Sequence, residues 1–276
     1  MTINKVFAPA KVNLTLHVTG QRKDGYHLLD SLVAFADVGD RITVMPADTP
    51  RFEVIGPRAA GVPTDDTNLV VRAAALFGIP VHIILSKYLP ASAGIGGGSS
   101  DAAATLLALS DLAGDTRLPN GAVELGADVR VCLLRQAARM RGIGEDVIPY
   151  SDLPPLYAVL ANPGIEVPTP AVFKALEDKE NPPMPKRLPQ GMKSRAFIKW
   201  LASQRNDLQD PAIAAAPVIG DVLNALSSLP DARLTRMSGS GATCFALFDT
   251  EKAAQDAARL FSSQQPGWWI EPARLS

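Results

Sequence analysis

Hydrophobic and polar residues alternate along residues 12–19, which places four apolar side chains on one face: Val12, Leu14, Leu16 and Val18. Successive side chains of a β-strand point to opposite faces, so this alternation predicts a half-buried strand. Gly20 ends the pattern, and Lys23-Asp24-Gly25 is typical of a turn.

The rest of the chain mixes short strand patterns with helical ones. Strands are predicted over residues 40–45, 52–55, 81–85, 156–161, 233–237, 243–248 and 268–271. Helices are predicted over residues 68–77 (capped by Thr67), 100–112, 196–206, 212–226 and 252–262, with a short helix after Pro170. Strands of antiparallel style with interspersed helices predict the α+β class.

A change of composition near residues 150–155 predicts a boundary between an N-terminal lobe, 1–154, and a C-terminal lobe, 155–276. Within the second lobe, residues 178–195 are rich in proline and lysine and show no periodicity. They predict a mobile loop.

The composition is that of an ordinary globular protein, with 47% hydrophobic residues, 20% charged residues and a net charge of −1 over 276 residues. No block of like charge suggests nucleic acid or a membrane as a partner, although a few basic residues could still bind an anionic substrate. No apolar run is long enough to span a membrane, and the first residues show no signal-peptide pattern. Cys132 and Cys244 have no disulfide-framework or metal-ligand spacing and are expected to be buried, so we expect a cytoplasmic protein.

The chemistry is concentrated in Gly94-Ile-Gly-Gly-Gly-Ser-Ser100, between a predicted strand and a predicted helix. Glycines allow positive φ and close approach of the backbone to a ligand, and the free N–H groups of a helix start favour a phosphate. The two serines add hydroxyls for phosphate oxygens or Mg²⁺. A flexible turn with a serine cap is the simpler alternative. The run fits neither GxxxxGK[ST] nor GxGxxG, because Ser99 stands at the last glycine position.

Together with Pro90, this run resembles the phosphate loop of the GHMP kinase superfamily. Residues 8–14, Ala-Pro-Ala-Lys-Val-Asn-Leu, resemble its N-terminal motif, and residues 237–242, Met-Ser-Gly-Ser-Gly-Ala, resemble its third motif. The resemblance implies a two-lobed fold, with a ribosomal-protein-like N-terminal lobe, a ferredoxin-like C-terminal lobe and the active site between them. It also implies ATP and Mg²⁺ as cofactors.

Three further segments, at residues 20–27, 125–129 and 161–174, are similar to one branch of that superfamily. This branch phosphorylates the 2-hydroxyl of a methylerythritol alcohol that carries a cytidine diphosphate group, in the non-mevalonate route to isoprenoids. The resemblance implies a catalytic pair, Lys11 and Asp128. It implies nucleotide contacts at Asn68, Lys87, Pro90, Ala91, Ser92, Ala93, Gly94, Ile95, Gly96, Gly97, Gly98, Ser99 and Ser100, with Ser100 a candidate metal ligand. It implies substrate contacts at Asn13, Tyr26, His27, Thr169 and Phe173.

Taken one at a time, these residues have simpler interpretations. Asp128 alone would be a helix cap or turn residue, and Lys11 a solvated charge at a strand edge. An isolated Tyr26 or Phe173 would be core or turn packing. Because of the resemblance, we prefer the functional interpretation of each of these residues to the simpler one. The resemblance also predicts that Tyr26 and Phe173, from different lobes, face each other with His27 beside them to hold a base.

Two other functions stay open. One is a GHMP kinase for a mevalonate derivative, homoserine or a sugar, which would have no need of Tyr26, His27 and Phe173. The other is a silent nucleotide-binding module, for which Arg130 and Arg135 are the argument, since both depart from the superfamily pattern. For any of these functions we expect a small-molecule substrate and a monomer or homodimer.

Overall fold

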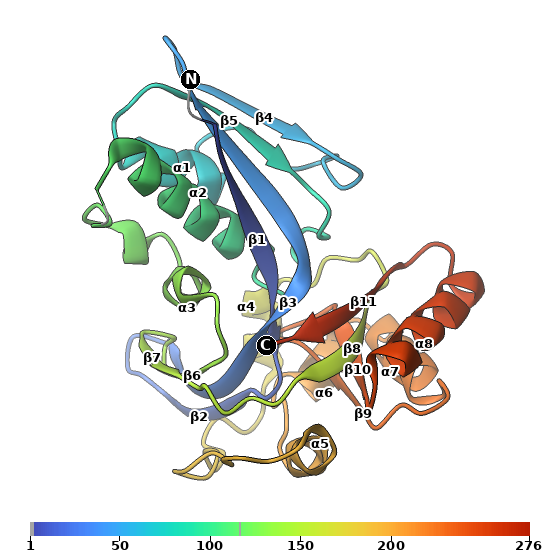
Figure 1. Cartoon of the computed structure of the whole chain (residues 1–276). Helices are drawn as coiled ribbons and strands as arrows, with labels where there is room; N and C mark the ends of the chain where they lie inside the picture. Colours follow the sequence, from blue (N-terminus) through green and yellow to red (C-terminus); the bar gives the residue numbers. More distant parts are fainter. Residues whose placement is uncertain (1–2, 116) are drawn as a thin grey trace. The chain divides into compact units, whose positions relative to one another are not determined.

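The computed structural model describes residues 3–115 and 117–276, and its elements are labelled in Figure 1. The chain forms two compact units. The first contains the chain up to Lys11, Val38–Ala91 and Gly96–Arg135, and the second contains Val12–Asp37, Ser92–Ile95 and Gln136–Ser276. Strands β1 (Asn4–Asn13) and β3 (His27–Pro46) contribute to both units. The division therefore differs from the expected lobes 1–154 and 155–276.

The first unit is a sheet covered by two helices. The second half of β3 pairs antiparallel with β5 (Val81–Ser86), and β5 pairs parallel with β4 (Arg51–Ile55). Helices α1 (Leu69–Ala75) and α2 (Gly97–Ala113) pack against each other, and both contribute to one core with the sheet. The core is formed by alternate residues of β3 and β5 and by the inner sides of the helices: Ile42, Val44, Val81, Ile83, Leu85, Val70, Ala104, Ala108 and Leu109. A short 3₁₀ helix (Ala122–Glu124) and α3 (Val129–Leu134) complete the unit.

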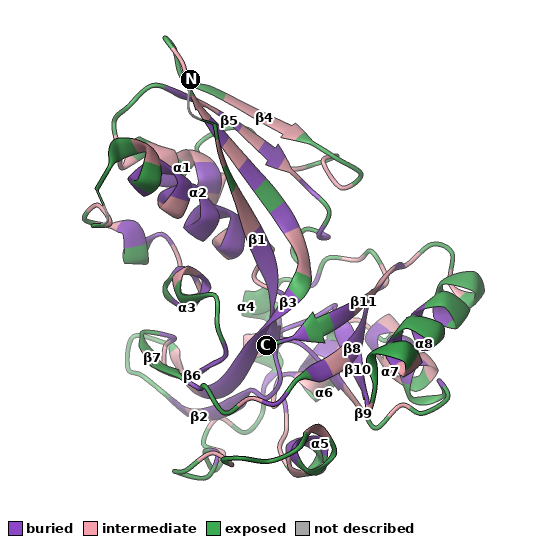
Figure 2. Cartoon of the chain, in the orientation of Figure 1, coloured by how far each residue is buried: buried purple, intermediate pink, exposed green. Residues whose placement is uncertain are grey.

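The second unit contains a ferredoxin-like sheet. Its four strands are β8 (Leu156–Asn162), β9 (Leu234–Met237), β10 (Cys244–Phe248) and β11 (Trp269–Leu275), in the spatial order β11–β8–β10–β9. Neighbouring strands are antiparallel. Helices α7 (Val218–Ser227) and α8 (Glu251–Gln264) share one apolar core with β8 and β10, and Figure 2 shows the outer side of α8 exposed. The remaining helices are α4 (Thr169–Ala175), α5 (Ser194–Ala202) and α6 (Gln209–Ala215). This strand order matches the ferredoxin-like lobe that the resemblance implies.

A further antiparallel group in the second unit joins β2 (His17–Gln21), the first half of β3, β6 (Ala138–Gly142) and β7 (Asp146–Pro149). The proline-rich segment 178–195 is anchored to this group. Arg139 on β6 donates to the carbonyl oxygens of Met184, Pro185 and Lys186, at 3.2, 2.9 and 3.0 Å. The segment is a loop before α5, as predicted. The three hydrogen bonds from the Arg139 side chain hold the middle of this loop in place.

The predicted strand over residues 12–19 is wrong in extent and in exposure. β1 ends at Asn13 and β2 begins at His17, and the polar positions between the apolar ones are buried as well. Their side chains have partners: Thr15 Oγ1 accepts from the Leu32 N–H at 2.9 Å, and a His17 ring nitrogen lies 3.2 Å from the Pro182 oxygen. Alternation located the apolar face, but it could not show that hydrogen bonds bury the polar face too.

The single helix predicted over residues 212–226 is two helices, α6 and α7, separated at Ala216 and Pro217. Other elements differ from prediction at their ends. The cap of α1 is Asn68 rather than Thr67, because Asn68 Oδ1 accepts from the Val70 N–H at 2.9 Å. Helix α2 begins at Gly97 rather than residue 100, so the last glycines of the phosphate-loop motif form its first turn. The start of β1, the first half of β3, and all of β6 and β7 were not predicted, because a continuous apolar run or an arginine-rich strand lacks clear alternation.

Candidate active site

Lys11 and Asp128 form an ion pair within the first unit. Lys11 Nζ donates to Asp128 Oδ2 at 2.7 Å, although the two residues are 117 positions apart in sequence. The Lys11 side chain is 5% exposed and that of Asp128 is 32% exposed. A buried ammonium needs a counter-ion, whereas a carboxylate open on one side remains accessible to a ligand. The solvated edge charge considered for Lys11 is therefore wrong.

Asp128 occupies the N-cap position of α3 but does not act as a cap. Within the described residues, its side chain makes no hydrogen bond to the first turn of the helix. The helix thus positions the carboxylate, and the lysine binds it. Arg130 and Arg135, which both depart from the superfamily pattern, are exposed and leave this ion pair intact.

The phosphate-loop motif changes from loop to helix at Gly96. Gly96 has φ of +61° and forms the N-cap of α2, a backbone conformation that favours glycine. A Cβ at Gly97 would lie 3.3 Å from Lys87 Nζ, so that ammonium lies beside the first turn of the helix. The end of the motif therefore presents helix N–H groups next to a cation, which is an arrangement that binds phosphate.

The first half of the motif is fixed by backbone packing within the second unit. Ser238 Oγ donates to the Gly94 oxygen at 2.9 Å and accepts from the Asn13 N–H at 3.0 Å. A Cβ at Gly94 would lie 2.5 Å from the Ser238 oxygen and 2.6 Å from that of Gly241. One hydroxyl thus joins the three stretches on which the resemblance rests, and the glycines allow their backbones to touch.

Lys87 is enclosed by two carboxylates. Its Nζ binds Asp40 Oδ2 and lies 2.9 Å from Asp101 Oδ2, and all three side chains are nearly inaccessible. Asp40 also accepts hydrogen bonds from the Tyr88 and Leu89 N–H groups, at 2.6 and 2.9 Å. Burial, followed by the neighbouring Asp40 charge, outweighs the Lys87 cation and raises the pKa of Asp101 to about 7. Burial opposes the charge on Lys87, but the two carboxylates raise its pKa on balance.

Asn68, another expected nucleotide contact, uses its side chain locally. Its Oδ1 caps α1, and its Nδ2 donates to the Pro63 oxygen at 2.7 Å. These bonds order the loop before α1.

The expected base-binding residues lie together in the second unit, but in a different arrangement. The rings of His27 and Phe173 stack, with centroids 4.8 Å apart and an interplanar angle of 24°. Tyr26 is 62% exposed and forms no part of this stack. Tyr26 and Phe173 belong to the same compact unit and not to different ones, because the hairpin that carries Tyr26 pairs with β6. The ring that meets Phe173 is thus His27.

The environment of His27 favours the neutral form of its ring. Burial lowers the pKa of His27 below its ordinary value, and the Lys179 charge lowers it further. Its Nε2 is buried and has no hydrogen-bond partner among the residues that the structure describes. A neutral ring with a free nitrogen can recognise the polar edge of a ligand.

Thr169 and Asn13 are held by serine hydroxyls in the same unit. Thr169, at the start of α4, lies with its Oγ1 2.8 Å from Ser240 Oγ in the glycine turn after β9. Asn13 Nδ2 donates to Ser31 Oγ at 2.8 Å. Asn13 Oδ1 is buried and, as far as the described chain extends, lacks a partner, so it can accept a hydrogen bond from a ligand.

Ser100 fits the role of a ligand for phosphate or metal. It lies in the first turn of α2 and is 1% exposed, and its Oγ has no partner in the described part of the chain. A buried hydroxyl without a partner is costly unless a ligand satisfies it. Within residues 3–115 and 117–276, however, no three His, Cys, Asp or Glu side chains gather to form a metal site by themselves. Both cysteines are buried, as expected, and burial raises the pKa of each thiol.

Several residues of these sites were not predicted from the sequence. They are the partners that fix the expected residues: Asp40, Asp101, Ser31, Ser238 and Ser240. Asp101 directly follows the glycine-serine run and could have been noticed there. Ser238 and Ser240 lie within the third motif, residues 237–242, but were not named there as site residues. Asp40 and Ser31 carry no local signal.

Comparison with known proteins agrees with the sequence motifs. Residues 68–139 match the GHMP kinases N terminal domain, and residues 194–266 match the GHMP kinases C terminal. The class is therefore that of the GHMP kinases, and the expected α+β GHMP kinase fold is confirmed. A solved homoserine kinase from Cytophaga hutchinsonii is only 19% identical, covers 99% of this chain and 94% of its own, and shares the fold with a TM-score of 0.66.

The similarity is much higher to one branch of the class. The 4-diphosphocytidyl-2-C-methyl-D-erythritol kinase of Dinoroseobacter shibae is 58% identical over 98% of this chain and 94% of its own length. The enzyme of that name from Cereibacter sphaeroides (strain ATCC 17025) is 54% identical over 99% of this chain and 100% of its own. A crystal structure of 4-(cytidine 5'-diphospho)-2C-methyl-D-erythritol kinase is 35% identical, covers 99% of both chains and has a TM-score of 0.81. The chain belongs to the 4-diphosphocytidyl-2-C-methyl-D-erythritol kinase family.

Members of the GHMP class are ATP-dependent phosphotransferases, so ATP is the phosphoryl donor that this membership implies. Of the described helices, none has both the length and the apolar character needed to cross a membrane.

Proposed function

We propose that this chain transfers the γ-phosphoryl group of ATP to the 2-hydroxyl of 4-diphosphocytidyl-2-C-methyl-D-erythritol, in the non-mevalonate route to isoprenoids. The relatives in Dinoroseobacter shibae and Cereibacter sphaeroides carry the name of this kinase. The observation that carries the proposal is the Lys11–Asp128 ion pair, at the two positions that the resemblance assigns to catalysis.

Asp128 accepts the proton of the substrate hydroxyl in this proposal. Its carboxylate is one-third exposed and does not cap its helix, so it is available to an alcohol. Such general-base assistance contributes about 10²–10⁴-fold to a rate. Lys11 holds one carboxylate oxygen at 2.7 Å and adds positive charge where negative charge develops.

Residues Pro90–Ser100 bind the phosphates of ATP, which supplies the transferred group when bound. The helix start at Gly97 and the unpartnered Ser100 hydroxyl are the groups that would contact phosphate oxygens or Mg²⁺. Asp40 and Asp101 already bind the Lys87 ammonium. Lys87 therefore supports phosphate binding by its positive charge beside Gly97. Asn68 supports it by ordering the start of α1.

His27 and Phe173 bind the cytidine end, with Tyr26 and Thr169 beside it. The two stacked rings lie 4.8 Å apart, which leaves no room for a third ring between them. A base that stacks on Phe173 must therefore displace the His27 ring or use the other face of Phe173. If His27 moves aside, its free Nε2 can bond the edge of the base while Tyr26 covers it. Asn13 Oδ1 is the remaining acceptor for a substrate hydroxyl.

The test compares Phe173→Ala with a control, Trp200→Ala. The control also removes one aromatic ring, whose centroid lies 5.3 Å from that of the Phe197 ring. Phe173→Ala should weaken binding of the cytidylyl substrate by about 1–3 kcal/mol and leave ATP binding unchanged. Trp200→Ala should change neither. Free CMP should compete with the substrate, and methylerythritol phosphate without the base should be a poor acceptor.

Coupled ADP release across an alcohol panel separates the alternatives. Rapid reaction of the base-free acceptor, of homoserine or of a mevalonate derivative would assign the protein to another GHMP activity. Tight ATP binding without turnover of any alcohol would leave only a nucleotide-binding role. We place the enzyme in the cytoplasm as a monomer or homodimer, which light scattering of the purified protein checks.

A further inference from the structure

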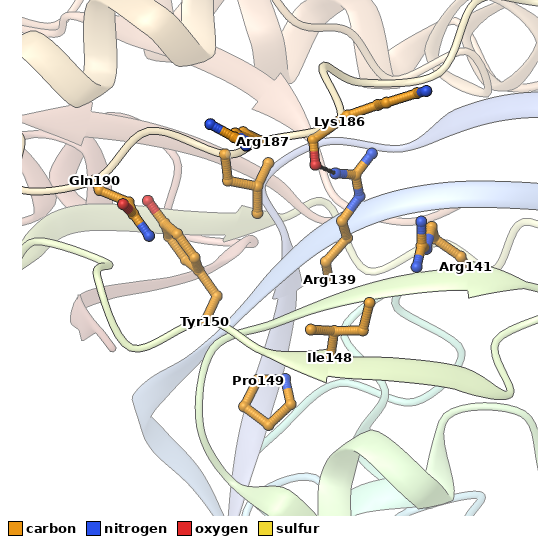
Figure 3. Close-up of a pocket in the computed structure, with 9 residues that line it drawn as sticks. Arg139, Arg141, Ile148, Pro149, Tyr150, Lys186, Arg187 and Gln190 are labelled. Carbon is orange, nitrogen blue, oxygen red and sulfur yellow. Dashed lines mark hydrogen bonds between the residues drawn. The ribbon is translucent and has the colours of Figure 1, made fainter.

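A cavity of about 570 Å³ lies in the second unit, under the proline-rich segment 178–195. Its lining contains four basic side chains and no carboxylate, together with apolar and amide groups: Arg139, Arg141, Ile148, Pro149, Tyr150, Lys186, Arg187, Leu188 and Gln190. Figure 3 shows Arg139, Arg141 and Ile148 on strands below the loop that carries Lys186 and Arg187. The proposed function uses none of these residues.

The cavity lies on the opposite face of the strand group from the His27–Phe173 stack. Asp30 on β3 pairs directly with Arg141, and Arg139 pairs directly with Ile148. Directly paired residues project to one side of a sheet, so Arg139, Arg141 and Ile148 share the face of Asp30. His27 precedes Asp30 by three positions on the same strand and therefore projects to the other face. The cavity is thus separate from the candidate cytidine site.

Arg139 builds the cavity but has no free donor for a ligand. It makes five hydrogen bonds, two to Asp30 and three to the carbonyl oxygens of residues 184–186. These bonds fix the loop backbone at the position of Lys186. The tertiary structure therefore holds the loop cations at a defined distance from the strands.

The remaining charges are available to an anion. Throughout the described chain, neither Lys186 nor Arg187 has a carboxylate within ion-pair distance. Arg141 pairs only with the exposed Asp146, at 3.0 Å, and its side chain is 45% exposed. Basic side chains that line a concave surface without counter-charges raise the local concentration of anions. Ile148, Pro149 and Leu188 provide an apolar wall beside them.

We propose that this cavity binds a small phosphate or diphosphate, either as the free anion or as the ester of a short apolar group. Arg187 and Arg141 supply the planar donors that match phosphate oxygens, and Lys186 supplies a further point charge. The apolar wall would contact the organic part of an ester. The site would be occupied independently of the kinase reaction.

The test is calorimetric titration of the full chain with inorganic diphosphate and with pentyl diphosphate, in the presence of excess ADP and CDP to fill the candidate active site. Lys186→Gln/Arg187→Gln should weaken binding of both ligands at least about tenfold, which is about 1.4 kcal/mol. The control is Arg195→Gln/Lys199→Gln, which removes the same two residue types from the exposed side of α5 and should bind like the wild type. Both double variants should keep the kcat and KM of the kinase reaction.

The two ligand sources give different results at the apolar wall. If the ligand is an ester, pentyl diphosphate binds more tightly than inorganic diphosphate, and Ile148→Ala removes that advantage. If it is the free anion, the two bind alike. The proposal is overturned if the wild type binds neither ligand with a Kd below about 10 mM. It is also overturned if the control variant loses as much affinity as the cavity variant.

Discussion

Arg139 and Asp30 form a bidentate ion pair between neighbouring strands, in which Arg139 Nε and Nη2 donate to the two carboxylate oxygens at 2.7 and 2.6 Å. The side chains are only 7% and 3% exposed. Asp30 also accepts from the Met184 N–H at 2.9 Å, so this one pair joins β3, β6 and the segment that follows α4. A planar guanidinium suits this geometry and a lysine does not.

Arg139→Ala should destabilise the protein strongly, because Asp30 would remain buried without its counter-ion. Loss of one partner of a buried pair costs about 3–5 kcal/mol. Arg139→Lys should lose less stability than Arg139→Ala, because lysine keeps a positive charge near Asp30. Urea unfolding of both variants measures the effect. Arg141→Ala, at a half-exposed arginine of the same strand, should change the free energy of unfolding by less than about 0.5 kcal/mol. Equal stability of Arg139→Ala and wild type would show that the pair is dispensable.

Asp128→Asn should keep the fold and bind ATP, with a lower Tm because the buried Lys11 ammonium loses its counter-ion. It should turn over about 10²–10⁴-fold more slowly, since asparagine keeps the shape and cannot take the proton. Steady-state ADP release and thermal unfolding together check this. Adding Lys11→Ala to Asp128→Asn should reduce kcat by less than the two separate losses combined, because the pair acts as a unit. Turnover of Asp128→Asn at the wild-type rate would remove Asp128 from the mechanism.

Gly94 and Gly97 should respond differently to alanine. Gly94 has φ of +71°, and its Cβ would meet the Ser238 backbone oxygen at 2.5 Å, so Gly94→Ala should lower stability by about 1–3 kcal/mol. Gly97 is helical, and the atom nearest to its Cβ would be the end of the flexible Lys87 side chain, at 3.3 Å, with Leu89 side-chain atoms at ordinary contact distances of 3.8 and 3.9 Å. Gly97→Ala should therefore keep or raise the Tm and weaken ATP binding.

The control for this pair is Gly220→Ala in α7, where a Cβ would make an ordinary contact of 3.5 Å with Ile213. It should leave ATP affinity unchanged. Differential scanning fluorimetry with and without ATP measures both properties. If Gly97→Ala lost stability without ATP as Gly94→Ala does, the end of the run would be a structural turn and not a phosphate site.

Asp101 should make stability depend on pH. Burial raises its pKa to about 7 in the folded protein from an ordinary value of 3.8, so the folded state holds this proton more firmly. The resulting stabilisation is complete below about pH 4 and is lost as the pH rises to about 7, with a slope of up to about 1.4 kcal/mol per pH unit. Asp101→Asn cannot titrate and should lack this decline.

Urea midpoints of the wild type and Asp101→Asn at pH 5, 6, 7 and 8 check this dependence. Other titrating groups are common to both proteins and cancel in the difference. Asp111→Asn, on the exposed side of the same helix, should follow the wild-type curve. Parallel curves for wild type and Asp101→Asn would mean that Asp101 is ionised throughout this range.

The amino-acid sequence alone located the glycine-serine run, the order of the three motifs and the class of the protein. It could do so because a phosphate loop depends on the conformational freedom and the hydroxyls of adjacent residues, which one continuous segment contains. Most helices and the strands of the second half also followed from local periodicity. Periodicity failed at β6 and across residues 12–17, where buried polar side chains are satisfied by distant partners.

Only the tertiary structure decided how the candidate residues are held. Lys11 meets Asp128 across 117 positions, and Asp30 meets Arg139 across 109. His27, rather than Tyr26, stacks on Phe173, and two carboxylates bind Lys87. Local rules relate residues three or four positions apart, whereas burying a charge requires a counter-charge from wherever the chain returns. The pairing of these buried groups is therefore a property of the packed chain and not of any single segment.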